Sequence, residues 1–201
     1  MMERKIVFLD IDGVLQKVSS QERFEHINNR EPEKDDMPML YRRLEYQFKI
    51  DFKKYNRYDV AAVYYDWHKT SVELLKLTLS LIGAQIVLSS DWRLEGFERM
   101  KDFFTIHGLQ NYFVDMTDNE DKIDKTVVDE IRNKCLKEIG KDAYISHRTI
   151  EILEWLGRNP DVKKWVAIDD MGLEGLGKHF VRTNYRYTWK EAEKCIRLLS
   201  D

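Results

Sequence analysis

Two aspartates near the start of the sequence, Asp10 and Asp12, are the clearest candidates for chemistry. They end a short apolar run, and residues two apart on a strand point to the same side, so their carboxylates are expected to lie close together. Gly13 then lets the chain turn away tightly. Because close carboxylates repel each other, such a pair persists where a cation or a shared proton neutralises it. Mg²⁺ fits this role, since it binds one or two carboxylates together with a substrate phosphate and makes that phosphate more electrophilic.

A second acidic pair, Asp169 and Asp170, leaves another apolar run at residues 165–169. Adjacent carboxylates at the end of a buried strand are costly without a nearby cation, and this pair would complete the oxygen ligands that the first pair lacks. The alternatives are ordinary ones: solvated acids at a strand end for the first pair, and an acidic surface turn for the second.

Serines and arginines supply candidate phosphate contacts. Ser89 and Ser90 follow a third apolar run, where hydroxyls and free backbone N–H groups can cradle phosphate oxygens, and Arg93 could add a charge-assisted contact. Arg148 stands at the start of a predicted helix, where a cation is unfavourable toward the helix dipole, which suggests a role toward an anion. The alternatives are a helix N-cap at Ser90 or Asp91 and a surface position for Arg148.

The elements that must position these residues alternate between short apolar runs and helical patterns. Strands are predicted at residues 5–10, 85–88, 112–115, 165–169 and 179–182, and helices at 70–82, 95–106, 127–139, 149–156 and 189–199. This alternation predicts an α/β fold with a Rossmann-like, parallel five-stranded sheet flanked by helices on both faces. In such sheets ligands bind beyond the carboxyl ends of the strands, where Asp10, Ser89 and Asp169 are expected.

Two segments are too long for this simple alternation. Residues 16–68 are expected to form a small cap over the site, and residues 116–145 a loop plus one helix, both within a single domain spanning residues 1–201. The net charge of −3 gives no overall sign of a nucleic-acid binder, and no apolar run is long enough for a membrane span. Cys135 and Cys195 have no CxxC partner, and the first apolar run is too short for a signal peptide, so we expect a cytoplasmic protein.

In order and spacing, these motifs resemble the four motifs of the haloacid dehalogenase superfamily. The motifs are an Asp-x-Asp-Gly-Val strand end, a hydrophobic strand ending in Ser, a basic residue about twenty positions before the last strand end, and Asp-Asp, which together span residues 8–170. Ser-Ser-Asp-Trp-Arg, followed by Arg-Thr-Ile-Glu-Ile-Leu-Glu-Trp-Leu, further resembles the haloacid dehalogenase domain of Swiss Army Knife RNA-repair proteins.

The resemblance implies a role for each matching residue. Asp10 would be the nucleophile that becomes an aspartyl-phosphate, and Asp12 the general acid for the leaving oxygen and then the base for water. The implied Mg²⁺ ligands are Asp10, the backbone carbonyl of Asp12, Asp170 and, through water, Asp169. Ser89 or Ser90 would hold the phosphate.

Arg148 departs from the family pattern, because most relatives have Lys at that place; Arg93, Lys163 and Lys164 are alternatives for the role. Asp12 indicates the reaction type, since dehalogenases lack this acid and transport ATPases carry Thr there. The resemblance therefore implies a Mg²⁺-dependent phosphatase or a phosphomutase, and we favour phosphoryl transfer from a phosphomonoester to water.

The substrate is less constrained by the sequence. Residues 40–58 hold six basic and two acidic residues with interleaved aromatics, which is typical of a surface that binds a nucleotide or oligonucleotide. Alternatively, Leu40, Leu44, Phe48 and Phe52 form one face of an amphipathic helix that packs on the domain. The candidate functions are thus hydrolysis of a phosphorylated small molecule, phosphatase action on polynucleotide ends in repair, phosphotransferase or phosphomutase activity, and non-catalytic nucleic-acid binding.

Overall fold

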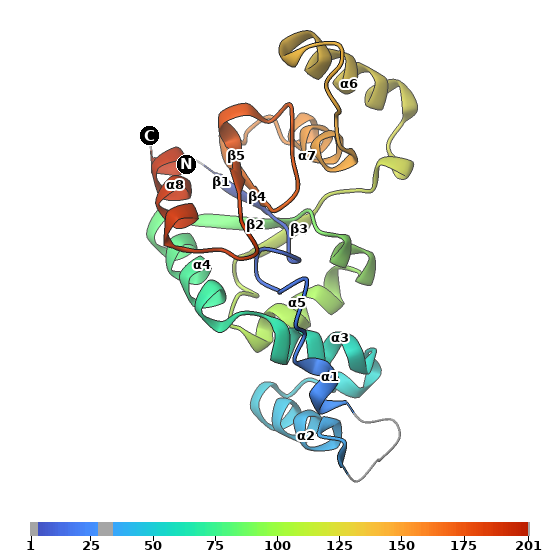
Figure 1. Ribbon diagram of the computed structural model, residues 1–201, viewed down its shortest axis with the longest axis vertical. Coiled ribbons are helices and arrows are strands. Elements are labelled where there is room, and N and C mark those ends of the chain that lie inside the picture. The colour runs from blue at the N-terminus through green and yellow to red at the C-terminus, as the bar shows by residue number, and fades with distance from the viewer. Residues whose placement is uncertain (1–3, 28–33, 201) are drawn as a thin grey trace.

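Five strands form one parallel sheet in the computed structural model, which describes residues 4–27 and 34–200 (Figure 1). The sheet has the order β3-β2-β1-β4-β5, with every neighbouring pair parallel. The strands are β1 (Lys5–Leu9), β2 (Ala84–Leu88), β3 (Phe113–Met116), β4 (Lys164–Asp169) and β5 (Phe180–Arg182). The predicted α/β class and five-stranded parallel sheet are therefore confirmed.

The central strands are apolar on both faces because helices cover both sides of the sheet. Val7 and Leu9 of β1 belong to one buried cluster, to which α4 (Lys69–Ile82), α5 (Phe97–Ile106) and α8 (Trp189–Ser200) contribute. Ile6 and Phe8 face a second cluster with α7 (His147–Arg158). Figure 1 shows α4 and α8 together on one side of the sheet and α7 on the other. The ends of the strands lie beyond this packing, and ligands of such sheets bind at the carboxyl ends.

We call residues 16–68 the inserted segment. Its first and last residues lie next to each other at the sheet. The Gln16 and Trp67 backbones pair, and His68 donates its backbone N–H to the Leu15 carbonyl at 2.6 Å. Its helices are α1 (Arg23–His26), α2 (Met37–Phe48) and α3 (Arg57–Ala61), which gather at one end of the molecule (Figure 1). Its role as a cap over the site stays a prediction.

The amphipathic pattern in the inserted segment predicts correctly which residues are buried, but these residues do not form one continuous helix. Leu40, Leu44 and Phe52 are all buried in the main cluster. However, α2 ends at Phe48 because Lys49 adopts a left-handed conformation (φ 59°), so Phe52 lies in a separate 3-10 turn. The apolar face of this basic segment is thus used for packing.

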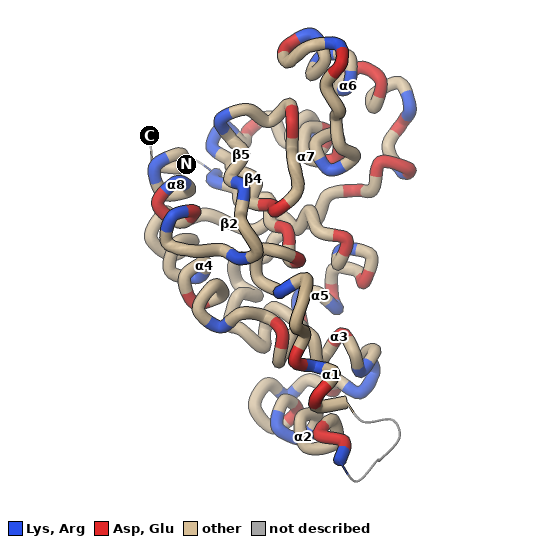
Figure 2. Tube along the Cα trace, in the orientation of Figure 1, with Lys and Arg blue, Asp and Glu red and all other residues tan. Residues whose placement is uncertain are grey.

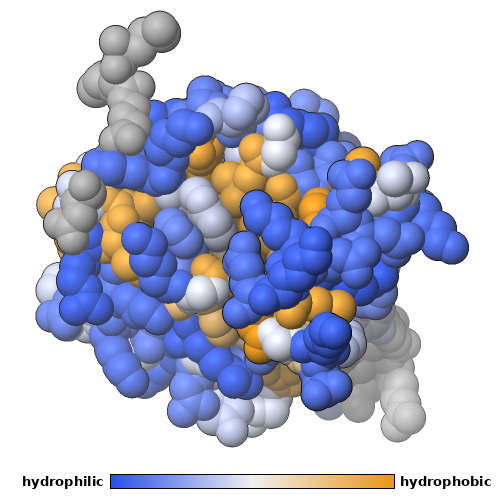
Figure 3. Space-filling view, turned by 90° about the horizontal axis from the view of Figure 1, so that it is seen from above, coloured by the Kyte–Doolittle hydropathy of each residue, from blue (hydrophilic) through white to orange (hydrophobic). Residues whose placement is uncertain are grey.

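The segment 116–145 contains a 3-10 turn and one helix, α6 (Lys125–Ile139). Val128 and Cys135 of α6 pack with Ile145 and Ile150 into a third buried cluster, next to α7. Cys135 and Cys195 are free and buried. Among the described helices, none combines the length and apolarity needed to cross a membrane. The molecular face viewed in Figure 3 is mainly hydrophilic, with apolar side chains in separate patches.

Candidate active site

The strand register brings candidate residues from three strands to one edge of the sheet. Leu9 of β1 pairs with Leu88 of β2 and with Ile168 of β4, so Asp10, the next residue, lies between Ser89 and Asp169. Side chains at matching positions of neighbouring strands point to the same face of a sheet. Figure 2 shows acidic residues at these strand ends in the middle of the molecule, with basic residues prominent on α2 and near α3.

Three carboxylates meet at this edge. Asp10, Asp169 and Asp170 each place one oxygen within 4.8 Å of the others, and the first two are buried. Burial, followed by the negative charge of Asp169, raises the pKa of Asp10 to about 7. Burial likewise raises the pKa of Asp169, which Arg148 opposes. Such a group is electrostatically costly unless a cation joins it.

The donor set fits a hard divalent cation. Among the described residues, no hydrogen bond reaches the Asp170 carboxylate, so its oxygens are open to a ligand, and carboxylate oxygens are donors that suit Mg²⁺. Gly13 makes the approach of Asp170 possible: a Cβ at this position would lie 2.3 Å from Asp170 Oδ2, and its φ of 70° also favours glycine. The carboxylate of Asp12 is outside the group; the prediction for Asp12 concerned its backbone carbonyl.

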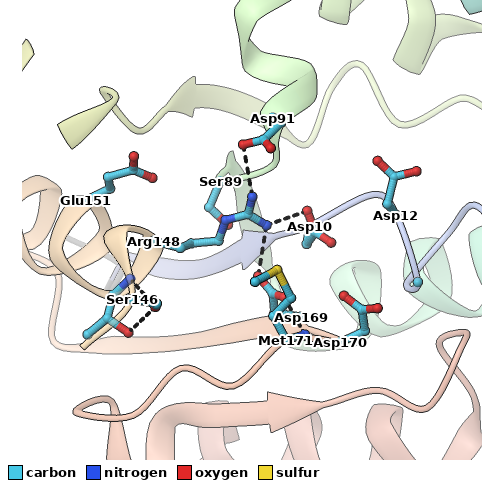
Figure 4. Close-up of polar contacts among 12 residues, drawn as sticks. Asp10, Asp12, Ser89, Asp91, Ser146, Arg148, Glu151, Asp169, Asp170 and Met171 are labelled. Carbon is cyan, nitrogen blue, oxygen red and sulfur yellow. Dashed lines mark hydrogen bonds and ion pairs between the residues drawn. The ribbon is translucent and has the colours of Figure 1, made fainter. Parts of the chain in front are cut away.

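Arg148 is the cation that the protein itself brings to these carboxylates. It lies in the first turn of α7, which Ser146 caps by accepting the Thr149 N–H. Its guanidinium donates to Asp10 Oδ1 at 2.6 Å, to Asp169 Oδ2 at 3.0 Å and to Asp91 Oδ1 at 3.2 Å (Figure 4). Burial acts to lower the pKa of Arg148, but Asp10 and Asp169 outweigh it and the net shift is upward. A permanently charged donor therefore stands beside the candidate nucleophile.

The other candidates for this basic position lie elsewhere. Lys164 is the first residue of β4 and Asp169 the last, so Lys163 and Lys164 are at the opposite edge of the sheet, about 16 Å away along the strand. The expectation that Lys163 or Lys164 could take the place of Arg148 is therefore wrong, because the two ends of a strand lie at opposite edges of the sheet.

Arg93 is buried, and protein groups already use its donors. It forms two bonds to the Glu151 carboxylate, at 2.8 and 2.9 Å, and donates to Asn119 Oδ1 and to the Ser89 carbonyl. Glu151 belongs to α7, one turn after Arg148. The structure thus does not bring Arg93 to the carboxylates as a phosphate contact; Arg93 instead ties the turn after β2 to the helix that carries Arg148.

Asp12 has its own set of partners, which the sequence did not reveal. Trp92 Nε1 donates to Oδ2 at 3.1 Å, and Gln16 Nε2 donates to Oδ1 at 2.7 Å. Burial raises the pKa of Asp12, and these two hydrogen bonds act to lower it. A carboxyl group with a raised pKa can donate a proton nearer neutral pH. The signal for Trp92 was its place in Ser-Ser-Asp-Trp-Arg, but only the fold shows its target.

Both candidate serines are buried at the end of β2. Ser89 is in register with Asp10, and Figure 4 places its side chain beside Arg148. Ser90 Oγ lies near enough to Asp10 to lower its pKa, yet it has no hydrogen-bond partner of good geometry in the described structure. A buried hydroxyl without a partner beside the nucleophile is suited to a phosphate oxygen.

Fold and site together define a domain of the haloacid dehalogenase superfamily. A model of the family described as the HAD domain in Swiss Army Knife RNA repair proteins matches residues 6–193, and the chain belongs to that family. Membership implies a phosphatase of the haloacid dehalogenase type or a related activity. No curated protein and no solved structure gives a significant match to this chain.

Proposed function

We propose that the protein is a Mg²⁺-dependent phosphatase that hydrolyses a phosphomonoester through a phosphorylated Asp10. The observation that supports this most directly is the group formed by Asp10, Asp169 and Asp170, with Arg148 bonded to two of its members. A nucleophilic carboxylate, a cation site and a fixed guanidinium are the parts that phosphoryl transfer requires.

In the first step, a carboxylate oxygen of Asp10 attacks phosphorus, and the bond from phosphorus to the leaving oxygen breaks. Asp12 donates its proton to that oxygen, so an alcohol departs. Arg148 and the free hydroxyl of Ser90 donate to the phosphoryl oxygens as charge develops on them. Bound Mg²⁺, held by Asp10, Asp169 and Asp170, would offset the negative charge that the phosphate and the carboxylates share.

In the second step, water hydrolyses the phosphorylated Asp10. Asp12, now ionised, accepts a proton from the water, whose oxygen attacks phosphorus; the bond between Asp10 and phosphorus breaks. Phosphate and the free Asp10 carboxylate result. Trp92 and Gln16 hold Asp12 in place for both proton transfers.

For the substrate, we propose phosphorylated nucleotides or the phosphorylated ends of RNA, in keeping with the family's description as RNA repair proteins. A phosphotransferase or phosphomutase would use the same residues, but it would move the phosphoryl group to an organic hydroxyl. Measuring free phosphate against transferred phosphate separates these two outcomes.

The test compares turnover of an aryl phosphate by the wild-type protein with Mg²⁺, by the wild-type protein with EDTA, and by Asp10→Asn with Mg²⁺. We expect activity only in the first case, with a loss of more than about 10⁴-fold in Asp10→Asn, because its amide cannot attack phosphorus. Thermal unfolding of Asp10→Asn should stay cooperative. Retained turnover in the variant would refute the assignment of Asp10 as the nucleophile. Metal-independent turnover would refute the proposed cation site.

A further inference from the structure

A cavity of about 460 Å³ adjoins the active site on the side of β4 and β5. Asp170 is one of its lining residues, together with Arg182 at the end of β5, Asn184 and Tyr185 in the loop that follows, and Lys190 in the first turn of α8. Residues 182–190, which we call the β5–α8 segment, have no role in the phosphoryl transfer proposed for Asp10 and Asp12. Because parallel strands end at the same edge, and Arg182 pairs with Asp169, the β5–α8 segment begins next to the candidate cation site.

The β5–α8 segment is hydrogen-bonded directly to the turn that follows Asp12 and to Asp170. Thr183 Oγ1 donates to the Gly13 carbonyl at 2.8 Å, and the Tyr187 backbone N–H donates to the Val14 carbonyl at 2.8 Å. Arg182 Nε donates to the Asp170 carbonyl at 3.0 Å. The cavity is therefore held at a constant position relative to Asp170 and the turn that follows Asp12.

The cavity lining carries two basic side chains, Arg182 and Lys190, and two acidic ones, Asp170 of the candidate cation site and Glu191. Arg182 and Lys190 are both exposed, and neither forms an ion pair within residues 4–27 and 34–200. The nearby acid Glu191 is buried and accepts hydrogen bonds from the backbone and hydroxyl of Thr188. Two free cations beside a phosphate site favour a ligand with a further negative charge.

Tyr185 adds an aromatic surface. Tyr185 is 72% exposed, and its backbone is left-handed with φ 72°, a conformation that is strained for a non-glycine residue. An exposed aromatic ring between cations is the combination with which proteins hold single-stranded nucleotides, because the ring stacks on a base while the cations bind phosphate.

The inserted segment, which the sequence favoured as the nucleotide-binding surface, differs in this respect. Lys54 is paired with Asp102 at 3.1 Å and Arg57 with Asp35 at 2.6 Å. Arg43 donates to the Tyr64 hydroxyl at 2.8 Å. Much of its charge is thus already used within the protein.

We infer that the β5–α8 segment forms a second phosphate subsite, in which Arg182 and Lys190 bind another phosphate of the substrate and Tyr185 stacks on the adjoining base. This inference deepens the proposed function and rests on it. It makes a phosphorylated oligonucleotide, rather than a substrate with a single phosphate, the preferred ligand.

The test uses short RNA oligonucleotides, phosphorylated at one end or the other, and an aryl phosphate as the single-phosphate reference. The double variant Arg182→Ala/Lys190→Ala should raise KM for the oligonucleotide at least tenfold more than KM for the aryl phosphate. For single strands, the slope of log affinity against log salt concentration changes by about 0.7 for each phosphate bound, so losing this one phosphate contact should reduce the slope by about 0.7. Tyr185→Ala should weaken oligonucleotide binding about tenfold with little change in its salt dependence.

The control is Arg42→Ala/Lys53→Ala, which removes two exposed cations of the inserted segment that have no ion pair among the described residues. It should leave both KM values unchanged. Equal KM changes for both substrates in Arg182→Ala/Lys190→Ala would overturn the subsite, as would a selective oligonucleotide defect in the control variant alone.

A binding measurement separates failure of the subsite from failure of the proposed function. Fluorescence anisotropy with Asp10→Asn as the background reports oligonucleotide affinity without turnover. If the wild-type protein hydrolyses nothing, the proposed function fails, yet tenfold weaker binding after the loss of Arg182 and Lys190 would still support the subsite. Unchanged affinity in that background would refute it.

Discussion

Two neighbouring regions of the site differ in how many of their side chains have protein partners. One region is the ends of β1 and β4, and the other is the turn after β2. At the ends of β1 and β4, Asp10, Asp169 and Asp170 crowd together, and one guanidinium is their only cationic partner from the described chain. In the turn Asp91–Glu95, by contrast, Trp92 and Arg93 both have protein partners.

The difference separates residues that react from residues that hold them. Carboxylates without enough positive charge form a region that gains stability when a metal ion and a phosphate bind. Groups whose hydrogen bonds are complete gain nothing from a ligand, but they fix geometry, because breaking a buried bond costs free energy. Changes in the first region should therefore abolish chemistry, and changes in the second should weaken it or lower stability.

After the loss of the nucleophile itself, the largest effect on activity should come from removing Arg148, the cation that contacts both regions. Arg148→Ala should lower kcat/KM for an aryl phosphate by about 10²–10³-fold, since it removes a preorganised donor for the phosphoryl oxygens. Arg148→Lys restores the charge but not the fork that reaches three carboxylates, so it should recover about tenfold. Activity of Arg148→Ala within tenfold of the wild type would show that Arg148 only balances charge in the resting protein.

Gly13→Ala should act on the cation site. A Cβ would overlap the Asp170 carboxylate, so we expect the Mg²⁺ concentration for half-maximal activity to rise about 10–100-fold. Gly83→Ala is the matched control: its φ of 66° gives the same backbone strain, but no atom lies within 4 Å of the added Cβ. Equal Mg²⁺ requirements in the two variants would mean that Asp170 does not bind the metal.

Trp92→Phe tests whether the turn Asp91–Glu95 supports catalysis by holding Asp12. Losing this hydrogen bond should lower kcat up to about tenfold for an alkyl phosphate, and less for an aryl phosphate, whose leaving group needs no proton. The indole N–H stabilises the ionised carboxylate, so its loss raises the pKa of Asp12. Asp12 then stays protonated to higher pH, so the alkaline limb of the kcat/KM profile should shift to higher pH.

Trp67→Phe provides the comparison for this experiment, because Trp67 packs against Trp92 but its Nε1 has no hydrogen-bond partner in the described part of the chain. Its pH profile should match that of the wild type. An unshifted alkaline limb in Trp92→Phe would separate Trp92 from the acid.

The smallest effect on activity should follow from Arg93→Ala. Removing it leaves Glu151 buried without its cation, which should lower the free energy of unfolding by about 3–5 kcal/mol in urea titrations. Arg93→Met/Glu151→Leu should recover part of that stability. The activity of folded Arg93→Ala should stay within about tenfold of the wild type; a loss as large as that of Arg148→Ala would make Arg93 a phosphate ligand after all.

Much of the site could be predicted because it depends on strand ends. Asp10, Ser89 and Asp169 each adjoin an apolar run, and parallel strands necessarily end at one edge. Arg148 could be anticipated from its place in a helix before the acidic pair. Trp92 and Gln16 could not, because their hydrogen bonds to Asp12 depend on how two turns approach each other.

The sequence by itself determined the parallel α/β sheet and the acids at its edge, because apolar runs of strand length and the residues that end them are local properties. Only the tertiary structure decided which arginine faces the carboxylates and which is tied to Glu151. It also decided which cations stay free, as Arg182 and Lys190 do, and which are paired within the inserted segment. The physical reason is that a side chain's charge and hydrogen bonds are assigned by neighbours distant in the chain, and no local pattern specifies those neighbours.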